Sequence, residues 1–191
     1  MPQSFTLPGM SQETGNKVAE ILQNRLSAMI DLQLTTKHVH WNVVGSNFIG
    51  VHEMLDPQYE AISLMSDTLA ERVAALGGEP NGTPGFVAKN RTWDDYSLGR
   101  ARAIEHLGAL NLVYEGVIKD HRKCIAELEE LDVVSQDVLI GQCEELEKFH
   151  WFVRAHLEND DGELSTKGQT ELRKAADAAD AGARRDNSVT A

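Results

Sequence analysis

The chain has 191 residues, of which 41% are hydrophobic and 25% charged, as expected for one compact folded domain and unlike a disordered chain. Thirty acidic residues against eighteen basic ones give a formal net charge of -12. This charge disfavours binding to a polyanion such as nucleic acid and favours binding to cations, although a solvated acidic surface also explains it.

The first half of the chain predicts two long helices. Apolar residues recur at helical spacing over residues 12–44, Ser11 is a suitable N-cap, and Gly45 ends the run. A second helical run covers residues 48–76 and stops at a pair of glycines, which favour the left-handed turn at a helix C-terminus.

Proline, glycine and asparagine residues mark a long loop over residues 79–97. Within this loop Thr92 is a candidate cap for one short helical turn at residues 93–96. The length of the loop predicts a crossover and not a hairpin.

The second half of the chain predicts two further long helices. One covers residues 98–131, and the other, capped by Ser135, covers residues 136–158. Four long amphipathic helices without alternating strand patterns predict an all-α bundle, and the long crossover between the second and third helices favours ferritin-like connectivity.

The predicted domain organisation has three parts. Residues 1–11 form an N-terminal arm, residues 12–158 form the four-helix bundle, and residues 159–191 form a mobile C-terminal tail. The tail is rich in Gly, Ser, Thr, Ala, Asp and Arg, and we expect at most a nascent helix over residues 171–181 within it.

The sequence predicts a cytoplasmic protein. The two cysteines, Cys124 and Cys143, lie in helical runs without a CxxC or Cys/His pattern and are interpreted as reduced packing residues. The N-terminus shows no basic region followed by an apolar run, and no apolar stretch is long enough to cross a bilayer. We therefore expect neither secretion nor membrane insertion.

The second predicted helix carries two polar pairs at helical spacing, His52 with Asp56 and Asp67 with Glu71. At about 100° per residue, all four side chains fall within an arc of roughly 100°. The apolar residues of this helix fall on a different stripe, which is the predicted core face: Val51, Leu55, Ile62, Met65, Leu69, Val73 and Leu76. The polar stripe therefore faces away from the core of its own bundle.

These two pairs cannot hold one metal ion within a single chain, because Asp56 and Asp67 lie about 16 Å apart along a helix. A second copy of this helix, packed antiparallel about a two-fold axis near residues 61–62, would bring His52 and Asp56 to the partner's Asp67 and Glu71. His40 joins this group, because the turn at Gly45 folds the first helix back beside the second. The sequence thus predicts two identical sites at a dimer interface.

The predicted ligands are two imidazoles and three carboxylates, a nitrogen and oxygen set that suits ferrous iron, manganese or zinc. Carboxylates also stabilise a hard ferric ion, which favours iron redox chemistry over a structural role. A rival di-iron site inside one bundle needs two Glu-x-x-His motifs, and only Glu147 with His150 matches. Pro57 could shorten the second helix and remove the helical meaning of the His52 to Asp56 spacing.

The segments KHVHW (37–41), FIGVHEMLD (48–56) and DTLAER (67–72) resemble the Dps family, the mini-ferritins named as DNA-binding proteins from starved cells. The resemblance runs from about residue 5 to 158 and is strongest with actinobacterial members. It includes ALGGEPNGTPG in the loop and ELEKFHWFVRAHLE near the end of the fourth helix. The inter-subunit ferroxidase ligands of the family match His40, His52, Asp56, Asp67 and Glu71 without a substitution.

The resemblance implies a ferroxidase enzyme that forms a hollow dodecamer and stores ferric iron in its cavity. It further implies that ferrous iron is oxidised preferentially by hydrogen peroxide, with oxygen as the other oxidant, which protects against oxidative stress. Trp41 resembles a tryptophan that supplies electrons or traps radicals in the family, and Lys37 is a candidate for tuning the site. The acidic residues Asp137, Glu144 and Glu145 are candidates for an entry pore at a three-fold axis, and a solvated face explains them nearly as well.

The alternative function is a nucleoid-associated protein that binds and compacts DNA, with metal binding secondary. The N-terminal arm offers little for this role, because Lys17 is its nearest basic residue. The candidate DNA-binding residues lie in the tail: Lys167, Arg173, Lys174, Arg184 and Arg185. Acidic residues balance their charge, so only local pairs could contact phosphates, with avidity from twelve tails.

Overall fold

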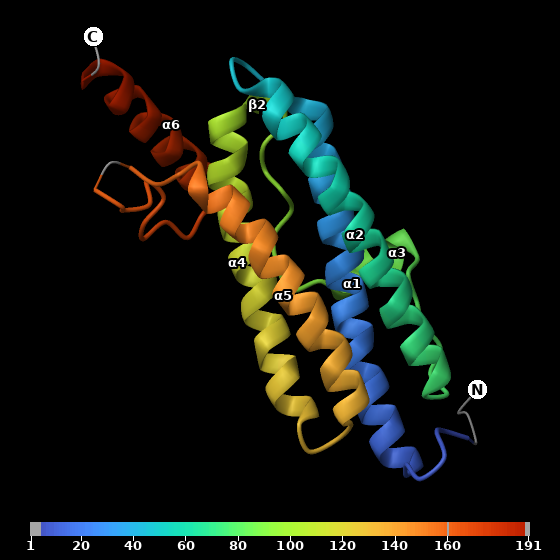
Figure 1. Ribbon diagram of the computed structural model, residues 1–191. Coiled ribbons are helices and arrows are strands. Elements are labelled where there is room, and N and C mark those ends of the chain that lie inside the picture. The colour runs from blue at the N-terminus through green and yellow to red at the C-terminus, as the bar shows by residue number, and fades with distance from the viewer. Residues whose placement is uncertain (1–4, 160, 190–191) are drawn as a thin grey trace. The chain divides into compact units, whose positions relative to one another are not determined.

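The computed structural model describes residues 5–159 and 161–189; the first four residues of the predicted arm and residues 160, 190 and 191 of the predicted tail lie outside this part. The described residues form six α-helices and two strands of two residues each, in the order shown by Figure 1. These elements are α1 (Gln12–Asn42), β1 (Val43–Val44), α2 (Phe48–Ala75), α3 (Pro84–Asn90), β2 (Ala101–Arg102), α4 (Ala103–Leu128), α5 (Val133–Ala155) and α6 (Leu172–Val189). The all-α prediction is confirmed. No helix in the described part is long and apolar enough to cross a membrane.

The chain divides into two compact units, and each of the four long helices has one part in the first unit and the other part in the second. The first unit contains the chain up to Leu34 together with Tyr59–Trp93 and Lys119–Glu144. The second contains Thr35–Gln58, Asp94–Ile118 and the chain from Glu145 onward. In α2, every residue of the predicted core stripe is at most 6% exposed, so the predicted inward face is confirmed.

Local hydrogen bonds fix the start of α1 and the end of α2 close to where the sequence predicted them. The Ser11 hydroxyl accepts the Thr14 amide at 3.1 Å and caps α1. At the end of α2, Gly77 has a φ of 87° and the Gly78 amide donates to the Val73 carbonyl at 2.8 Å. This is the left-handed C-terminal turn expected from a glycine pair.

Helix α2 runs continuously through Pro57. The four-residue spacing of His52 and Asp56 is therefore helical, as the predicted run over residues 48–76 requires, and Pro57 does not shorten the helix. Helix α1 ends two residues before the predicted limit, because residues 43–44 pair in parallel with residues 101–102 as strands. The same pairing makes α4 begin at Ala103, later than the predicted residue 98.

The crossover carries a short extra helix, as predicted, but at a different place. Helix α3 begins at Pro84, whose fixed φ suits the first turn of a helix, and not at the predicted residues 93–96. Trp93 instead donates from its indole nitrogen to Asp31 of α1 at 2.7 Å, and Arg91 contacts the same carboxylate at 3.2 Å. These contacts hold the end of the crossover in a non-helical conformation.

The predicted cap of the fourth long helix is also wrong. Helix α5 begins at Val133, and its N-cap is Asp132, whose carboxylate accepts the Ser135 amide at 3.1 Å. Asp132 also pairs with Arg72 of α2 at 2.7 Å. A carboxylate caps a helix as well as a hydroxyl does. The pairing with Arg72 holds Asp132 at the start of α5, so Asp132 and not Ser135 becomes the N-cap.

The C-terminal segment contains a longer helix than the nascent one expected over residues 171–181. Helix α6, red in Figure 1, buries Ala175, Ala176 and Ala179. Its backbone passes so close to Gly108 of α4 that a Cβ atom there would lie 2.5 Å from the Ala175 carbonyl oxygen. The mobility of this segment in solution stays a prediction.

Candidate metal centre

Two histidines, one from the end of α1 and one from the start of α2, hold each other in place. His40 Nδ1 lies 2.9 Å from the carbonyl oxygen of His52, and His52 Nδ1 lies 2.9 Å from the carbonyl oxygen of His40. Their rings stack with centroids 3.6 Å apart. A carbonyl oxygen only accepts, so each Nδ1 is a donor, and in the neutral ring the lone pair then lies on Nε2. This is how metal-binding histidines are commonly oriented.

Asp56, one turn after His52 on α2, lies beside the same pair. Its Oδ1 is 3.2 Å from His40 Nδ1 and 2.6 Å from Lys37 Nζ. The hydrogen bond from Lys37 is the largest influence on this carboxyl and holds the pKa of Asp56 below its ordinary value. The Asp56 side chain is 44% exposed, so the carboxylate remains accessible to a cation. The structure thus brings together His40, His52 and Asp56, with Lys37 beside them.

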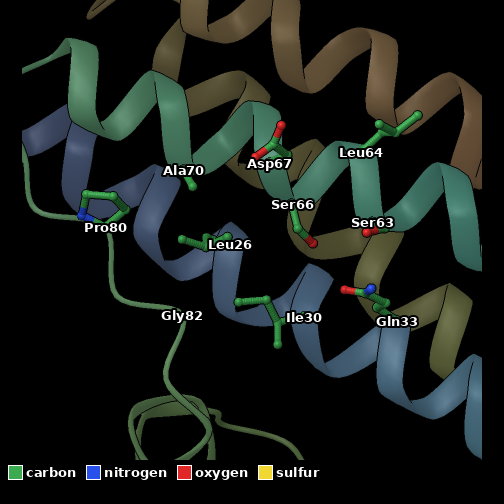
Figure 2. A pocket seen from close by; sticks show the side chains of 10 residues that line it. All are labelled: Leu26, Ile30, Gln33, Ser63, Leu64, Ser66, Asp67, Ala70, Pro80 and Gly82. Atoms are coloured by element: carbon green, nitrogen blue, oxygen red, sulfur yellow. The ribbon is translucent and has the colours of Figure 1, made fainter.

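The other predicted pair, Asp67 and Glu71, belongs to the other compact unit, and both side chains are exposed. Asp67 lines an open hollow of about 470 Å³. In Figure 2 residues of α1, α2 and the start of the crossover surround this hollow, including Leu26, Ile30 and Pro80. The described residues contain no group of three or more His, Cys, Asp and Glu side chains arranged to hold a metal ion.

Large apolar side chains are exposed one turn before each of these two candidate pairs. Ile49, three residues before His52, is 58% exposed, and Leu64, three residues before Asp67, is 68% exposed. Trp41, next to His40, is 71% exposed.

The remaining predicted site residues lie on the surface. Of the pore candidates, Asp137 and Glu144 are exposed, while Glu145 pairs with Lys148 at 3.3 Å. The DNA-binding candidates have partners within the chain. Lys167 pairs with Glu163, Lys174 with Glu171 and Arg184 with Asp180, and Arg173 donates to the Ser97 carbonyl oxygen. Arg185 is exposed.

Sequence reasoning missed a buried polar pair in the second unit. The Tyr96 hydroxyl lies 2.9 Å from His106 Nδ1, and His106 is 0% exposed. His38, on α1, presents its ring to Tyr96 edge-on at 5.8 Å. Tyr96 precedes α4 and its ten-residue separation from His106 matches no helical or strand period, so no signal in the sequence pointed to this contact.

Comparisons with known proteins agree with this architecture. The family model described as "Ferritin-like domain" matches residues 19–162. The "DNA protection during starvation protein" of Mycolicibacterium smegmatis is 58% identical over 176 residues, which cover 92% of this chain and 96% of that protein. The solved structure "Mycobacterium smegmatis Dps" superposes with a TM-score of 0.86 at 58% identity, covering 89% of this chain and 97% of that one.

A second solved structure, "DpsA14 from Streptomyces coelicolor", superposes with a TM-score of 0.84 at 52% identity. It covers 86% of this chain and 98% of that one. Matches of this length and identity extend over all four long helices and the crossover, and they confirm the ferritin-like fold predicted from the helix pattern.

Proposed function

Since the chain belongs to the Dps family of ferritin-like proteins, we propose that it oxidises ferrous iron at sites shared between two subunits and stores the ferric product. Its general role is that of an iron-sequestering mini-ferritin. Hydrogen peroxide is the preferred oxidant in this proposal, and a dodecamer with an internal cavity holds the iron.

One observation carries the site assignment: both imidazoles donate through Nδ1 to a backbone carbonyl, each to that of the other residue. The two Nε2 lone pairs are therefore fixed in direction before a metal ion arrives. Asp56 supplies an accessible carboxylate beside the same histidine pair, with its Oδ1 3.2 Å from His40 Nδ1. Nitrogen and carboxylate oxygen ligands suit ferrous iron, and the carboxylate stabilises the ferric product.

The coordination shell is completed by a symmetry mate in this proposal. Asp67 and Glu71 lie on the same continuous helix as His52, at an axial distance too large for one ion. Their exposure, the hollow beside Asp67 and the exposed Leu64 favour a surface that a second copy covers. An antiparallel two-fold dimer would place the pair on one copy opposite His52 and Asp56 on the other.

Iron oxidation by oxygen and by hydrogen peroxide, measured on purified and size-fractionated protein, tests the activity. We expect the double variant Asp67→Ala with Glu71→Ala to oxidise iron more slowly while its circular dichroism and oligomer size stay the same. Glu53→Ala, an exposed carboxylate on the same helix outside the proposed ligand set, is the matched control. Unchanged kinetics in the double variant would remove the assigned site.

The three acidic pore candidates are proposed to line the path by which ferrous ions enter the cavity. Asp137 and Glu144 are exposed carboxylates on α5, and Glu145 directly follows Glu144 in the sequence. Rings of carboxylates around a three-fold axis attract ferrous ions. Replacing Asp137 with Asn is expected to slow iron uptake into the core while leaving the first oxidation event intact.

DNA binding is a second candidate function, favoured by the name "DNA protection during starvation protein" that the relative from Mycolicibacterium smegmatis carries. A nucleoid-associated location within the cytoplasm belongs to this candidate. Arg184 and Arg185 are the adjacent basic pair that could contact a phosphate. Gel retardation at several salt concentrations, comparing the native chain with Arg184→Gln and Arg185→Gln, tests it. Absence of any shift at low salt would dismiss DNA binding.

A further inference from the structure

The chain has three tyrosines. Two of them have hydroxyl groups within hydrogen-bond distance of a buried side chain, which is an amide in one case and an imidazole in the other. Tyr114 is 0% exposed and donates to the amide oxygen of Gln58 at 2.7 Å. Tyr96 is partly buried and has its hydroxyl 2.9 Å from His106 Nδ1. An amide oxygen cannot take up a phenol proton at neutral pH, whereas a neutral imidazole can.

The presence of a proton acceptor beside the hydroxyl decides whether a tyrosine can be oxidised by one electron. A phenol that loses an electron must also lose its proton to give a stable phenoxyl radical, so a buried tyrosine needs a base in hydrogen-bond contact. Burial raises the pKa of both Tyr96 and Tyr114, so neither ionises spontaneously. Burial also lowers the pKa of His106, although the backbone at Asn42 and Gly99 opposes the shift. The neutral form of His106 is therefore favoured, and its Nδ1 lies within hydrogen-bond reach of the phenol.

We propose that Tyr96 and His106 form a redox pair that holds one oxidising equivalent during iron oxidation by peroxide. This inference rests on the proposed function. The pair lies close to the candidate metal centre in the fold. The His38 ring contacts Tyr96, and His38 is two residues before His40 on α1. Only the thickness of one helix, roughly 10 Å, separates the Tyr96 side of α1 from the His40 side.

The steps balance in atoms and charge. One ferrous ion and hydrogen peroxide give a ferric ion, hydroxide and a hydroxyl radical. The radical takes an electron from Tyr96 and becomes hydroxide, while the phenol proton moves to His106 Nδ1. A second ferrous ion then returns an electron to the phenoxyl radical, which recovers its proton from His106 and leaves a second ferric ion. Two ferrous ions are thus oxidised for each peroxide, and no free radical remains.

The test uses the intact, size-fractionated oligomer loaded with ferrous iron under anaerobic conditions and mixed with limiting hydrogen peroxide. Samples frozen during turnover are examined by electron paramagnetic resonance for a phenoxyl radical, and a spin trap reports escaped hydroxyl radical. The native chain and Tyr114→Phe should both show the phenoxyl signal. Tyr96→Phe should lose it and release more trapped radical. His106→Gln should lose most of the signal although Tyr96 is present.

An iron-free arm separates this inference from the proposed function. A flash-generated ruthenium polypyridyl oxidant, which needs no ferroxidase site, should produce the same Tyr96 radical in the native chain and not in Tyr96→Phe. Iron oxidation without a phenoxyl signal, an equal signal in Tyr96→Phe, or a signal that is lost only in Tyr114→Phe would each overturn the pair. If Tyr96→Phe fails to fold, judged by circular dichroism, the His106→Gln comparison decides.

Discussion

The imidazole Nδ1 of His40 donates to the backbone carbonyl of His52 at 2.9 Å, and the imidazole of His52 returns the same contact to His40. This reciprocal pair closes the turn between α1 and α2, and it leaves each Nε2 as the nitrogen that would bind a metal ion in the proposed site. It supplies half of the proposed coordination shell from one subunit, with Asp56 beside it. The other half, Asp67 and Glu71, has to come from a partner in the proposal.

Subunit mixing tests this sharing directly. One variant carries His52→Ala, the other carries Asp67→Ala with Glu71→Ala, and the two are co-expressed. In a mixed dimer one site loses both halves and the other keeps both, so random mixing should restore about one quarter of the native sites. Each variant alone should be slow in an iron oxidation assay. A mixture that is no faster than the separate variants would contradict a shared site.

The cap of α5 should control stability in a pH-dependent way. Burial alone would raise the pKa of Asp132, but hydrogen bonds from Ser135 and Arg72 outweigh it and hold the pKa below the ordinary value of 3.8. A carboxylate with a lowered folded pKa stabilises the protein above its unfolded pKa, and this stabilisation is lost as pH falls through the folded pKa. Asp132→Ala should lower the free energy of unfolding at pH 7 by about 2 to 3 kcal/mol.

The matched variant is Asp132→Asn, which keeps an acceptor for the cap and removes the charge. Its cost at pH 7 should be smaller than that of the alanine variant, and it should shrink as pH falls below about 4. Chemical denaturation across this pH range measures both. An Asn variant whose cost stays constant down to about pH 2 would mean that the charge of Asp132 contributes nothing.

Gly108 should be required for docking α6. Glycine to alanine inside a helix normally stabilises by roughly 0.5 to 1 kcal/mol. At Gly108 the new Cβ would lie 2.5 Å from the Ala175 carbonyl oxygen and 2.7 Å from the Ala179 Cβ, so we expect the opposite sign. At Gly116, on the same helix, a Cβ would meet no atom within 4 Å, and alanine there should give the normal stabilisation.

Limited proteolysis of residues 165–185 and thermal unfolding measure the effect of both glycine substitutions. Gly108→Ala should expose α6 to protease and lower the melting temperature, whereas Gly116→Ala should do neither. Equal protection in the two variants would show that α6 can shift on α4 without losing its contacts.

Asp31 should hold the end of the crossover. Its carboxylate accepts the Trp93 indole at 2.7 Å and contacts Arg91 at 3.2 Å, with Asp31 and Arg91 about one-fifth exposed. Asp31→Ala removes both contacts, and we expect a loss of about 1 to 3 kcal/mol. Amide hydrogen exchange over residues 91–97 should accelerate. Glu20→Gln, an exposed acid on the same helix, is the control, and equal exchange in both variants would argue against this anchor.

The sequence by itself determined the long helices and the direction in which α2 turns its polar side chains. His52 and Asp56, like Asp67 and Glu71, are four residues apart, and helical periodicity is a local property that needs no knowledge of the rest of the chain. The predicted core stripe of α2 is buried throughout for the same reason. The glycine pair after α2 likewise acts within a few residues.

Only the tertiary structure decided the features that depend on distant partners. Asp132 replaces Ser135 as the cap of α5 because Arg72 of α2 pairs with it. The helical turn expected near Trp93 is absent because Asp31 of α1 accepts its indole. The contact between Tyr96 and His106, and the passage of α6 over Gly108, join segments whose spacing follows no period. Periodicity specifies which face of a helix is polar, whereas the partner of a given polar group depends on how the segments pack.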